Sequence, residues 1–195
     1  MPRPLSFDRD AALDAALKLF WRRGYTATSL AELLQAMGIA RSSFYAAFGD
    51  KRSLYLESLQ LFGDRTRDIL TSAANKGDEL GAIRQFFHQT ITETPAHRLS
   101  WGCMMVNSIL ELTDVDSGIK DCAQAKLDDI EDEFERLLAR ARRQGKLPGD
   151  QSTRELARTL MTLNLGIRVE SRKRSNPAQL QHTIDTSLAL FGLAA

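Results

Sequence analysis

Four side chains close together in the sequence have the chemistry to bind nucleic acid. They are the guanidinium, hydroxyl and phenol groups of Arg41, Ser42, Ser43 and Tyr45. Such groups donate hydrogen bonds to base edges and phosphates, and one helix can carry them into a major groove. Phe44 and Phe48 are spaced so that a helix buries both and leaves these donors exposed. The sequence therefore predicts a DNA-contacting helix from about Arg41 to Phe48.

The segment before this helix predicts a second helix and a tight turn. Ser29 and Glu32 form a capping-box pattern, in which each side chain satisfies a backbone N–H of the other residue. Apolar residues then recur at helical spacing. Gly38 follows them, and glycine adopts at little cost the left-handed conformation that often ends a helix. The stretch from Thr28 to Lys51 is thus interpreted as a helix-turn-helix, with Lys51 well placed for a phosphate.

This stretch resembles the DNA-binding domain of the TetR family of dimeric bacterial regulators, over Phe7 to about Leu56. The matching residues are Phe20, Gly24, Tyr25, Thr28, Ser29, Gly38, Tyr45, Phe48, Lys51 and Leu54. The resemblance implies that Arg41, Ser42 and Ser43 read or approach the bases, while Tyr45 and Lys51 hold phosphates. The predicted DNA-binding residues are Thr28, Ser29, Arg41, Ser42, Ser43, Tyr45 and Lys51.

Three alanines depart from the family pattern. Ala40 stands where a Ser or Thr usually caps the second helix, and the missing cap costs about 1 kcal/mol. Ala46 and Ala47 stand where larger, often polar side chains are common, so fewer groups are available to read bases.

Charge and composition limit the possible functions. The 195 residues carry a net charge of +1, which argues against a general nucleic-acid coating protein. Residues 1–56 hold eight basic and five acidic side chains, a local charge of +3 that suits a few phosphate contacts. No window is long and apolar enough to cross a membrane, and no signal peptide opens the chain, so a cytoplasmic protein is expected.

Hydrophobic periodicity predicts an all-α fold, because no run of alternating apolar residues is convincing. The expected helices cover about 7–23, 29–37, 41–48, 51–74, 80–93 and 119–144, with two more at the C-terminus. A loop is expected from Ala96 to Ser100. We expect a DNA-binding domain over residues 1–50 and an effector-binding and dimerisation domain over residues 51–195.

The second domain has a closer resemblance of its own. Its segments WGCMMVNSILEL and NLGIRVESR are similar to a TetR branch with GCLLVN-type and GLRV-type segments, and that branch includes sensors of reactive electrophiles. The resemblance implies an apolar effector pocket with few polar groups. The predicted lining is Phe62, Phe86, Phe87, Trp101, Cys103, Met104, Asn107 and Met161. The alternative is that these residues simply fill a core.

Cys103 is the candidate reactive thiol. A thiol near a helix N-terminus has a raised thiolate fraction, because the helix dipole favours the anion. The alternative is that Cys103 is a small buried hydrophobe. Cys103 and Cys122 form no CxxC motif, and the three histidines form no set with metal-ligand spacing, so neither a metal nor a cofactor is expected.

The last two helices each carry an apolar seam. The seams are Leu156, Leu160, Leu163 and Ile167, then Leu180, Ile184 and Leu188. Core packing would explain either seam alone, but with the TetR resemblance both imply a four-helix homodimer interface. A dimer would place two heads on half-sites about 34–36 Å apart in a palindromic operator.

These predictions combine into a homodimeric repressor that a small-molecule or electrophilic effector releases from double-stranded DNA. A transcriptional activator remains an alternative. An enzyme on the same scaffold is a further alternative, with little support because Cys103 has no motif-spaced His and no Gly-rich phosphate loop is present.

Overall fold

The computed structural model describes residues 7–74, 77–93, 95–173 and 176–193. Within these ranges the regular structure is entirely helical, so the predicted all-α class is confirmed. The chain forms two compact units. The head unit comprises residues 1–63 and 104–124, and the body unit comprises residues 64–103 and 125–195. Two helices, α4 (Lys51–Ala74) and α8 (Ser117–Arg143), contribute residues to both units.

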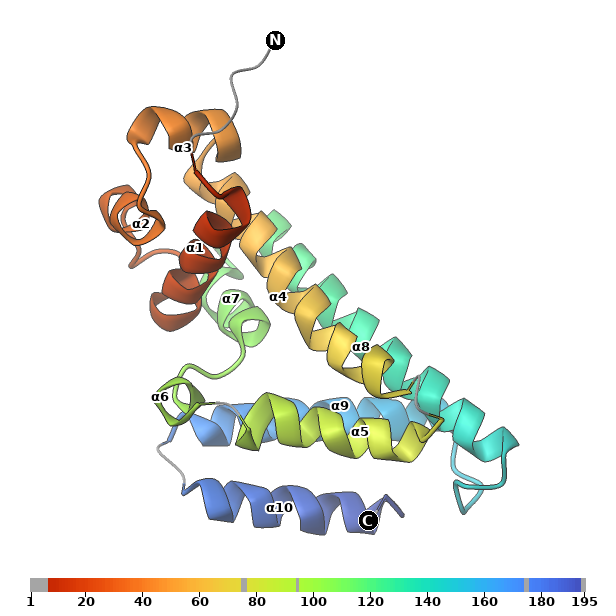
Figure 1. Ribbon diagram of the computed structural model, residues 1–195. Helices are drawn as coiled ribbons and strands as arrows, with labels where there is room; N and C mark the ends of the chain where they lie inside the picture. Colours follow the sequence, from red (N-terminus) through yellow and green to blue (C-terminus); the bar gives the residue numbers. More distant parts are fainter. Residues whose placement is uncertain (1–6, 75–76, 94, 174–175, 194–195) are drawn as a thin grey trace. The chain divides into compact units, whose positions relative to one another are not determined.

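The head unit is built around three N-terminal helices, α1 (Arg9–Arg23), α2 (Leu30–Met37) and α3 (Arg41–Phe48). The first part of α4 and helix α7 (Met104–Leu112) complete it, and α7 lies beside α1 (Figure 1). Its core comes from the apolar faces that helical spacing predicted. Phe20, Phe44 and Tyr55 are each at most 1% exposed.

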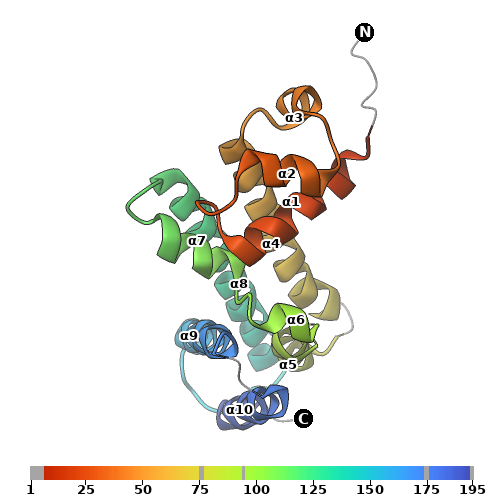
Figure 2. The same ribbon diagram turned by 90° about the vertical axis from the view of Figure 1, so that its left-hand side faces the viewer.

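In the body unit, α5 (Glu79–Phe87), α9 (Thr153–Ser171) and α10 (Pro177–Leu190) run alongside one another, as Figure 1 shows lengthwise and Figure 2 nearly end-on. Three aromatic rings form the centre of its core. The Phe86 and Phe134 rings are 5.1 Å apart, and the Phe87 and Phe134 rings are 6.1 Å apart. These rings are fully buried, so they stabilise the packing of α5 against α8.

Two segments of the body unit differ from the expectations. The helix expected to reach Glu93 is α-helical only to Phe87, and His88–Thr92 form a π-helix, η1. The expected loop after Pro95 instead forms a short helix, α6 (Ala96–Leu99), which Pro95 precedes as the N-cap residue. Such one-turn elements are too short to leave a periodic pattern in the sequence. The break expected at residues 75–77 lies partly outside the described residues.

Candidate nucleic-acid interface

Local hydrogen bonds fix the turn between α2 and α3. The Ser29 N–H donates to Glu32 Oε2 at 2.9 Å, and the Glu32 N–H donates to Ser29 Oγ at 3.3 Å. Gly38 has φ 66° and ψ 30°, the left-handed conformation that suits glycine. Helix α3 starts after Ala40, which makes no side-chain cap hydrogen bond. The predicted capping box, glycine turn and uncapped start of α3 are thus confirmed.

Helix α3 has one buried face and one exposed face. Phe44 is 0% exposed and Phe48 is 5% exposed. On the opposite face Arg41 and Ser42 are exposed, Ser43 is half-buried, and Tyr45 is 49% exposed. The donors are therefore held on a rigid helix whose other side is anchored in the head unit's core.

Arg9, which sequence reasoning missed, fixes the C-terminal end of α3. Its guanidinium carbon lies 4.5 Å from the centre of the Phe48 ring, and Nη2 donates to the Ala47 carbonyl at 3.3 Å. Nη1 pairs with Glu57 Oε1 at 2.6 Å, which raises the pKa of Arg9. The contacts span residues far apart in sequence, so no local pattern could have predicted them.

The remaining predicted DNA-binding residues lie around α3. Thr28 is 0% exposed, and its hydroxyl donates to the Gly24 carbonyl at 2.7 Å, so it does not face the surface. Ser29 is exposed at the N-cap of α2. Lys51 Nζ lies 4.3 Å from the centre of the Tyr25 ring. Burial lowers the pKa of Lys51 and raises that of Tyr25, so the ammonium rests on a neutral ring.

Helix α7 is attached to the loop between α1 and α2 through a single carboxylate. Glu111 Oε2 accepts the Tyr25 N–H at 3.0 Å, and Oε1 accepts the Thr26 N–H at 2.6 Å. Both bonds are charge-assisted, which makes them stronger than bonds between neutral groups. The loop leading into the helix-turn-helix is thus bonded to residues more than eighty positions later.

Two further contacts attach α7 and the start of α8 to α4. The Tyr55 hydroxyl lies 2.7 Å from Ser108 Oγ, and burial raises the pKa of Tyr55 to about 12. Arg52 donates two hydrogen bonds to Asp116, at 2.6 and 2.9 Å. The Arg52 guanidinium lowers the pKa of Asp116 to about 2. No sequence motif identifies either pair.

The predicted effector residues are divided between the two units. In the head unit, Phe62 packs edge-on against Trp21, while Met104 is buried and Asn107 is half-buried. In the body unit, Phe86 and Phe87 belong to the aromatic core described above. The Trp101 ring lies 5.9 Å from the His97 ring. Cys103 and Met161 are 2% and 4% exposed, and Cys103 immediately precedes α7.

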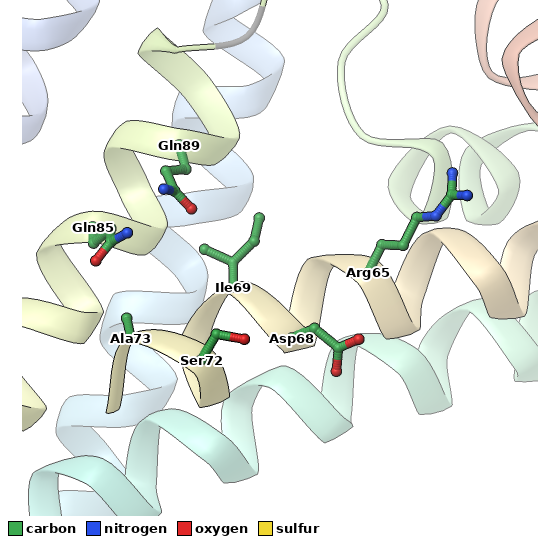
Figure 3. Close-up of a pocket in the computed structure, with 7 residues that line it drawn as sticks. All are labelled: Arg65, Asp68, Ile69, Ser72, Ala73, Gln85 and Gln89. Atoms are coloured by element: carbon green, nitrogen blue, oxygen red, sulfur yellow. The ribbon is translucent and has the colours of Figure 1, made fainter. Parts of the chain in front are cut away.

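A pocket of about 330 Å³ in the body unit is lined by none of these predicted effector residues. Its walls are Arg65, Asp68, Ile69, Ser72 and Ala73 of α4, Gln85 of α5 and Gln89 of η1. Figure 3 shows the two glutamine amides on the same side, near Ile69 and Ala73. Its size falls at the lower end of the range for small-molecule sites. The polar lining offers several hydrogen-bonding groups.

Most of the predicted dimer-seam residues are already buried within one chain. Five of them are at most 4% exposed: Leu160, Ile167, Leu180, Ile184 and Leu188. Leu156 and Leu163 are half-buried, and Leu156 lines a second pocket of about 540 Å³ near the end of α10. Beside the charged Glu155, Arg158, Glu170 and Asp185, the exposed sides of the two helices carry small or uncharged residues. They include Thr159, Thr162, Gly166 and Val169 on α9, and Thr183, Thr186 and Leu190 on α10.

Within the described ranges, no three His, Cys, Asp or Glu side chains are grouped as metal ligands would be. None of the described helices combines the length and apolar character that crossing a bilayer requires.

Sequence comparisons identify relatives for both parts of the chain. Residues 12–58 match the family of bacterial regulatory proteins called tetR, and residues 79–187 match the tetracyclin repressor-like C-terminal domain. The HTH-type transcriptional repressor ComR of Escherichia coli K12 is 30% identical, covering 97% of this chain and 91% of ComR. The uncharacterized HTH-type regulator YezE of Bacillus subtilis 168 is 29% identical, covering 98% and 100%.

Solved structures agree with these relatives. A cysteine mutant of the TetR family regulator CifR, in complex with a 26 bp double-strand operator DNA, superposes with a TM-score of 0.81. It is 29% identical, covering 97% of this chain and 99% of that one. Reduced NemR of Escherichia coli, 19% identical, has the same fold, with a TM-score of 0.79 and coverage of 93% and 96%. The relatives are regulators rather than enzymes, and this chain belongs to the TetR family of DNA-binding transcriptional regulators.

Proposed function

We propose that this protein is a homodimeric repressor that binds a palindromic operator through α3 and leaves it when an effector binds. The exposed face of α3 supports this most directly, because Arg41, Ser42 and Tyr45 lie opposite buried Phe44 and Phe48. The name of ComR, a transcriptional repressor, and the operator complex of CifR favour repression over activation. Since operator DNA is the partner, we propose that the protein acts in the bacterial cytoplasm.

The roles of the head residues follow from their placement. Arg41, Ser42 and the half-buried Ser43 would approach base edges, while Tyr45, Lys51 and the exposed Ser29 would contact phosphates. We propose that Thr28 acts indirectly, by holding the loop before α2 through its bond to the Gly24 carbonyl. The proposed DNA-binding domain covers residues 1–50, with residues 51–195 serving effector binding and dimerisation.

Titration of the DNA upstream of the protein's own gene tests this function. We expect tight binding that weakens as salt rises, because phosphate contacts release counterions. Arg41→Ala and Tyr45→Ala should each reduce operator affinity about 10- to 100-fold, the loss of one good contact. Arg143→Ala, an exposed change in the body unit, is the matched control and should leave affinity unchanged. Wild-type affinity in both α3 variants would contradict the proposed interface.

We propose that the dimer forms through the outward faces of α9 and α10. The originally predicted seam residues Leu160, Ile167 and Ile184 are at most 4% exposed within one chain, so they have little surface left for a partner. Several outward residues, Thr162 and Gly166 among them, are small, and small side chains let two helices approach closely. Two such helices from each chain would form a four-helix bundle.

A thiol-sensing mechanism is the second candidate, supported by Cys103. The thiol lies immediately before α7, the helix that Glu111 bonds to the head unit's loop. Modification of a thiol that is 2% exposed would require local opening of the structure, which could shift the equilibrium away from the DNA-binding state.

An electrophile titration of the operator complex tests this second candidate. N-ethylmaleimide should release the wild-type protein from its operator, while Cys103→Ser should remain bound. Cys122→Ser is the control, and it should respond like the wild type. Release of Cys103→Ser at the same rate as the wild type would exclude a sensing role for this thiol. The remaining hypothesis would then be an effector that binds without a covalent bond.

A further inference from the structure

Within the head unit, α7 places a carboxylate at the loop that leads into the helix-turn-helix. Glu111 Oε2 accepts the Tyr25 N–H at 3.0 Å, and Oε1 accepts the Thr26 N–H at 2.6 Å. Successive backbone N–H groups that converge on one anion form a nest, and the Glu111 carboxylate fills this one. Because each oxygen accepts from a different residue, one side chain fixes the loop backbone at two consecutive positions.

The glycine before these two residues leaves room for the carboxylate. A Cβ at Gly24 would overlap Glu111 Oε2 and lie 3.0 Å from the carboxyl carbon. Gly24 also has φ 83° and ψ 177°, a backbone conformation that is found almost only at glycine. The loop therefore has both the backbone shape and the open space that the Glu111 carboxylate requires.

Tyr25, whose backbone Glu111 holds, supports a lysine that is proposed to contact DNA. Lys51 Nζ lies 4.3 Å from the centre of the Tyr25 ring, which is a cation–π contact. The Tyr25 ring also packs edge-on against the Tyr55 ring, with ring centres 5.0 Å apart. The Tyr55 hydroxyl lies 2.7 Å from Ser108 Oγ, three positions before Glu111 on α7. Helix α7 thus holds Tyr25 directly at its backbone and, through Tyr55, at its ring.

We infer that Glu111 is a positioning residue for operator binding, because it holds the Tyr25 ring on which the Lys51 ammonium rests. A lysine ammonium is a point charge on a flexible chain, and the ring contact restricts where this ammonium lies. A donor that is already positioned loses less side-chain freedom when it binds a phosphate, so it binds more tightly. The inference rests on the proposed function, in which Lys51 contacts a phosphate, and it gives α7 a part in DNA binding.

Charge alone predicts the opposite effect of removing the Glu111 carboxylate. The carboxylate is a negative charge close to a surface that is proposed to bind phosphates. It also acts on the lysine, since burial lowers the pKa of Lys51 and the charge of Glu111 raises it. Without this charge the local potential would be more positive, and DNA binding would be stronger. A loss of operator affinity on neutralising Glu111 therefore cannot result from the change of charge.

A double-mutant cycle tests the inference on the purified full-length protein. Glu111→Gln keeps the size of the side chain but presents an amide donor to one of the two N–H groups. It should weaken operator binding about tenfold and reduce its salt dependence. Lys51→Met keeps an apolar chain over the Tyr25 ring and removes the charge. It should reduce the slope of log affinity against log salt concentration by about 2, one phosphate contact for each subunit.

The two changes together separate positioning from general damage to the head unit. In the Lys51→Met background, Glu111→Gln should change operator affinity less than about twofold, because the contact that Glu111 positions is already lost. Asp114→Asn is the matched control, since it neutralises an exposed carboxylate three positions after Glu111. It should leave operator affinity unchanged.

Amide hydrogen exchange of the free protein gives a second measurement that needs no DNA. In Glu111→Gln the Tyr25 and Thr26 amides should exchange at least about tenfold faster than in the wild type, because they lose their acceptor. The Leu33 amide, which donates to the Ser29 carbonyl inside α2, should exchange as in the wild type. If Glu111→Gln does not fold, Glu111→Asp replaces it in both measurements, because it keeps the charge and is one methylene too short to reach both N–H groups.

Three results would overturn the inference. They are operator affinity of Glu111→Gln equal to or above that of the wild type, an equal loss of affinity with and without the Lys51 charge, and unchanged exchange of the Tyr25 and Thr26 amides. Failure of the wild type itself to bind operator would instead contradict the proposed function. Amide exchange would then still decide whether Glu111 holds the loop.

Discussion

Ala40 shows the effect of a single missing side chain at the start of α3. Its backbone, with φ −72° and ψ 153°, already has the extended conformation of an N-cap residue. Ala40→Ser should therefore raise the free energy of unfolding by about 1 kcal/mol, because the new hydroxyl can accept a backbone N–H of the first turn. Urea denaturation of the wild type and the variant measures this difference.

The control for this prediction is Ala46→Ser, in the exposed middle of α3. The hydroxyl of a serine there has no unpaired backbone N–H from which to accept a hydrogen bond. Serine also has a lower helix propensity than alanine. It should leave stability unchanged or slightly lower it. An equal result for the two variants would show that the first turn of α3 gains nothing from a side-chain cap.

The sequence predicted residue exposure well inside helices and poorly outside them. Helical spacing fixed Arg41 and Tyr45 on the face opposite Phe44, and the structure places them there. Thr28 lies before α2, where no periodic pattern relates one side chain to the next. Thr28 is completely buried and its hydroxyl donates to the Gly24 carbonyl, and sequence alone reveals neither fact.

At the scale of elements, the helix boundaries with strong local signals were predicted correctly. The capping box of α2, the glycine turn and the start of α4 depend on neighbouring residues. The contacts of α7 and the start of α8 with the rest of the head unit depend on Glu111, Ser108 and Asp116, whose partners lie at least fifty positions away. Such pairs obey no spacing rule, so the sequence predicted the helices but not these contacts.

The pair of Arg52 and Asp116 predicts a pH dependence of stability. The folded-state pKa of Asp116, about 2, lies below the ordinary value of 3.8 for this side chain. The ion pair therefore stabilises the folded state fully above about pH 4. This contribution should be lost as the pH falls from about 4 to about 2. Urea denaturation across this pH range should show that the free energy of unfolding of the wild type declines as the pH falls. The decline should be smaller in Asp116→Asn.

Asp114→Asn is the control for this measurement, since Asp114 is an exposed neighbour on the same turn. The free energy of unfolding of Asp114→Asn should decline as the pH falls, by as much as in the wild type. If Asp116→Asn also followed the wild-type curve, the ion pair would contribute nothing measurable, as is common for exposed pairs.

At the scale of the whole molecule, the proposed dimer interface can be tested at Gly166. A Cβ added at Gly166 meets no atom within 4 Å in its own chain, and Gly166 is exposed, so Gly166→Arg should not disturb the fold. In a two-fold interface the same residue enters from both subunits, so two arginines would be buried together. The dissociation constant of the dimer should rise at least about tenfold, and operator affinity should fall as a result.

Sedimentation velocity of Gly166→Arg, beside Ala125→Arg on the exposed side of α8, measures this effect. The control should remain dimeric, since α8 is outside the proposed interface. An unchanged dimer dissociation constant in Gly166→Arg would show that the dimer interface does not include this face of α9.

The π-helix at His88–Thr92 also affects how this chain should be compared with its relatives. A turn closed by i→i+5 hydrogen bonds holds one residue more than an α-helical turn. A relative whose α5 continues as an unbroken α-helix would be matched correctly only with a one-residue gap inside the helix. Without that gap, every later position of this helix would be paired with a neighbour rotated by about 100°. Buried Ile91 would then be equated with a residue that faces elsewhere.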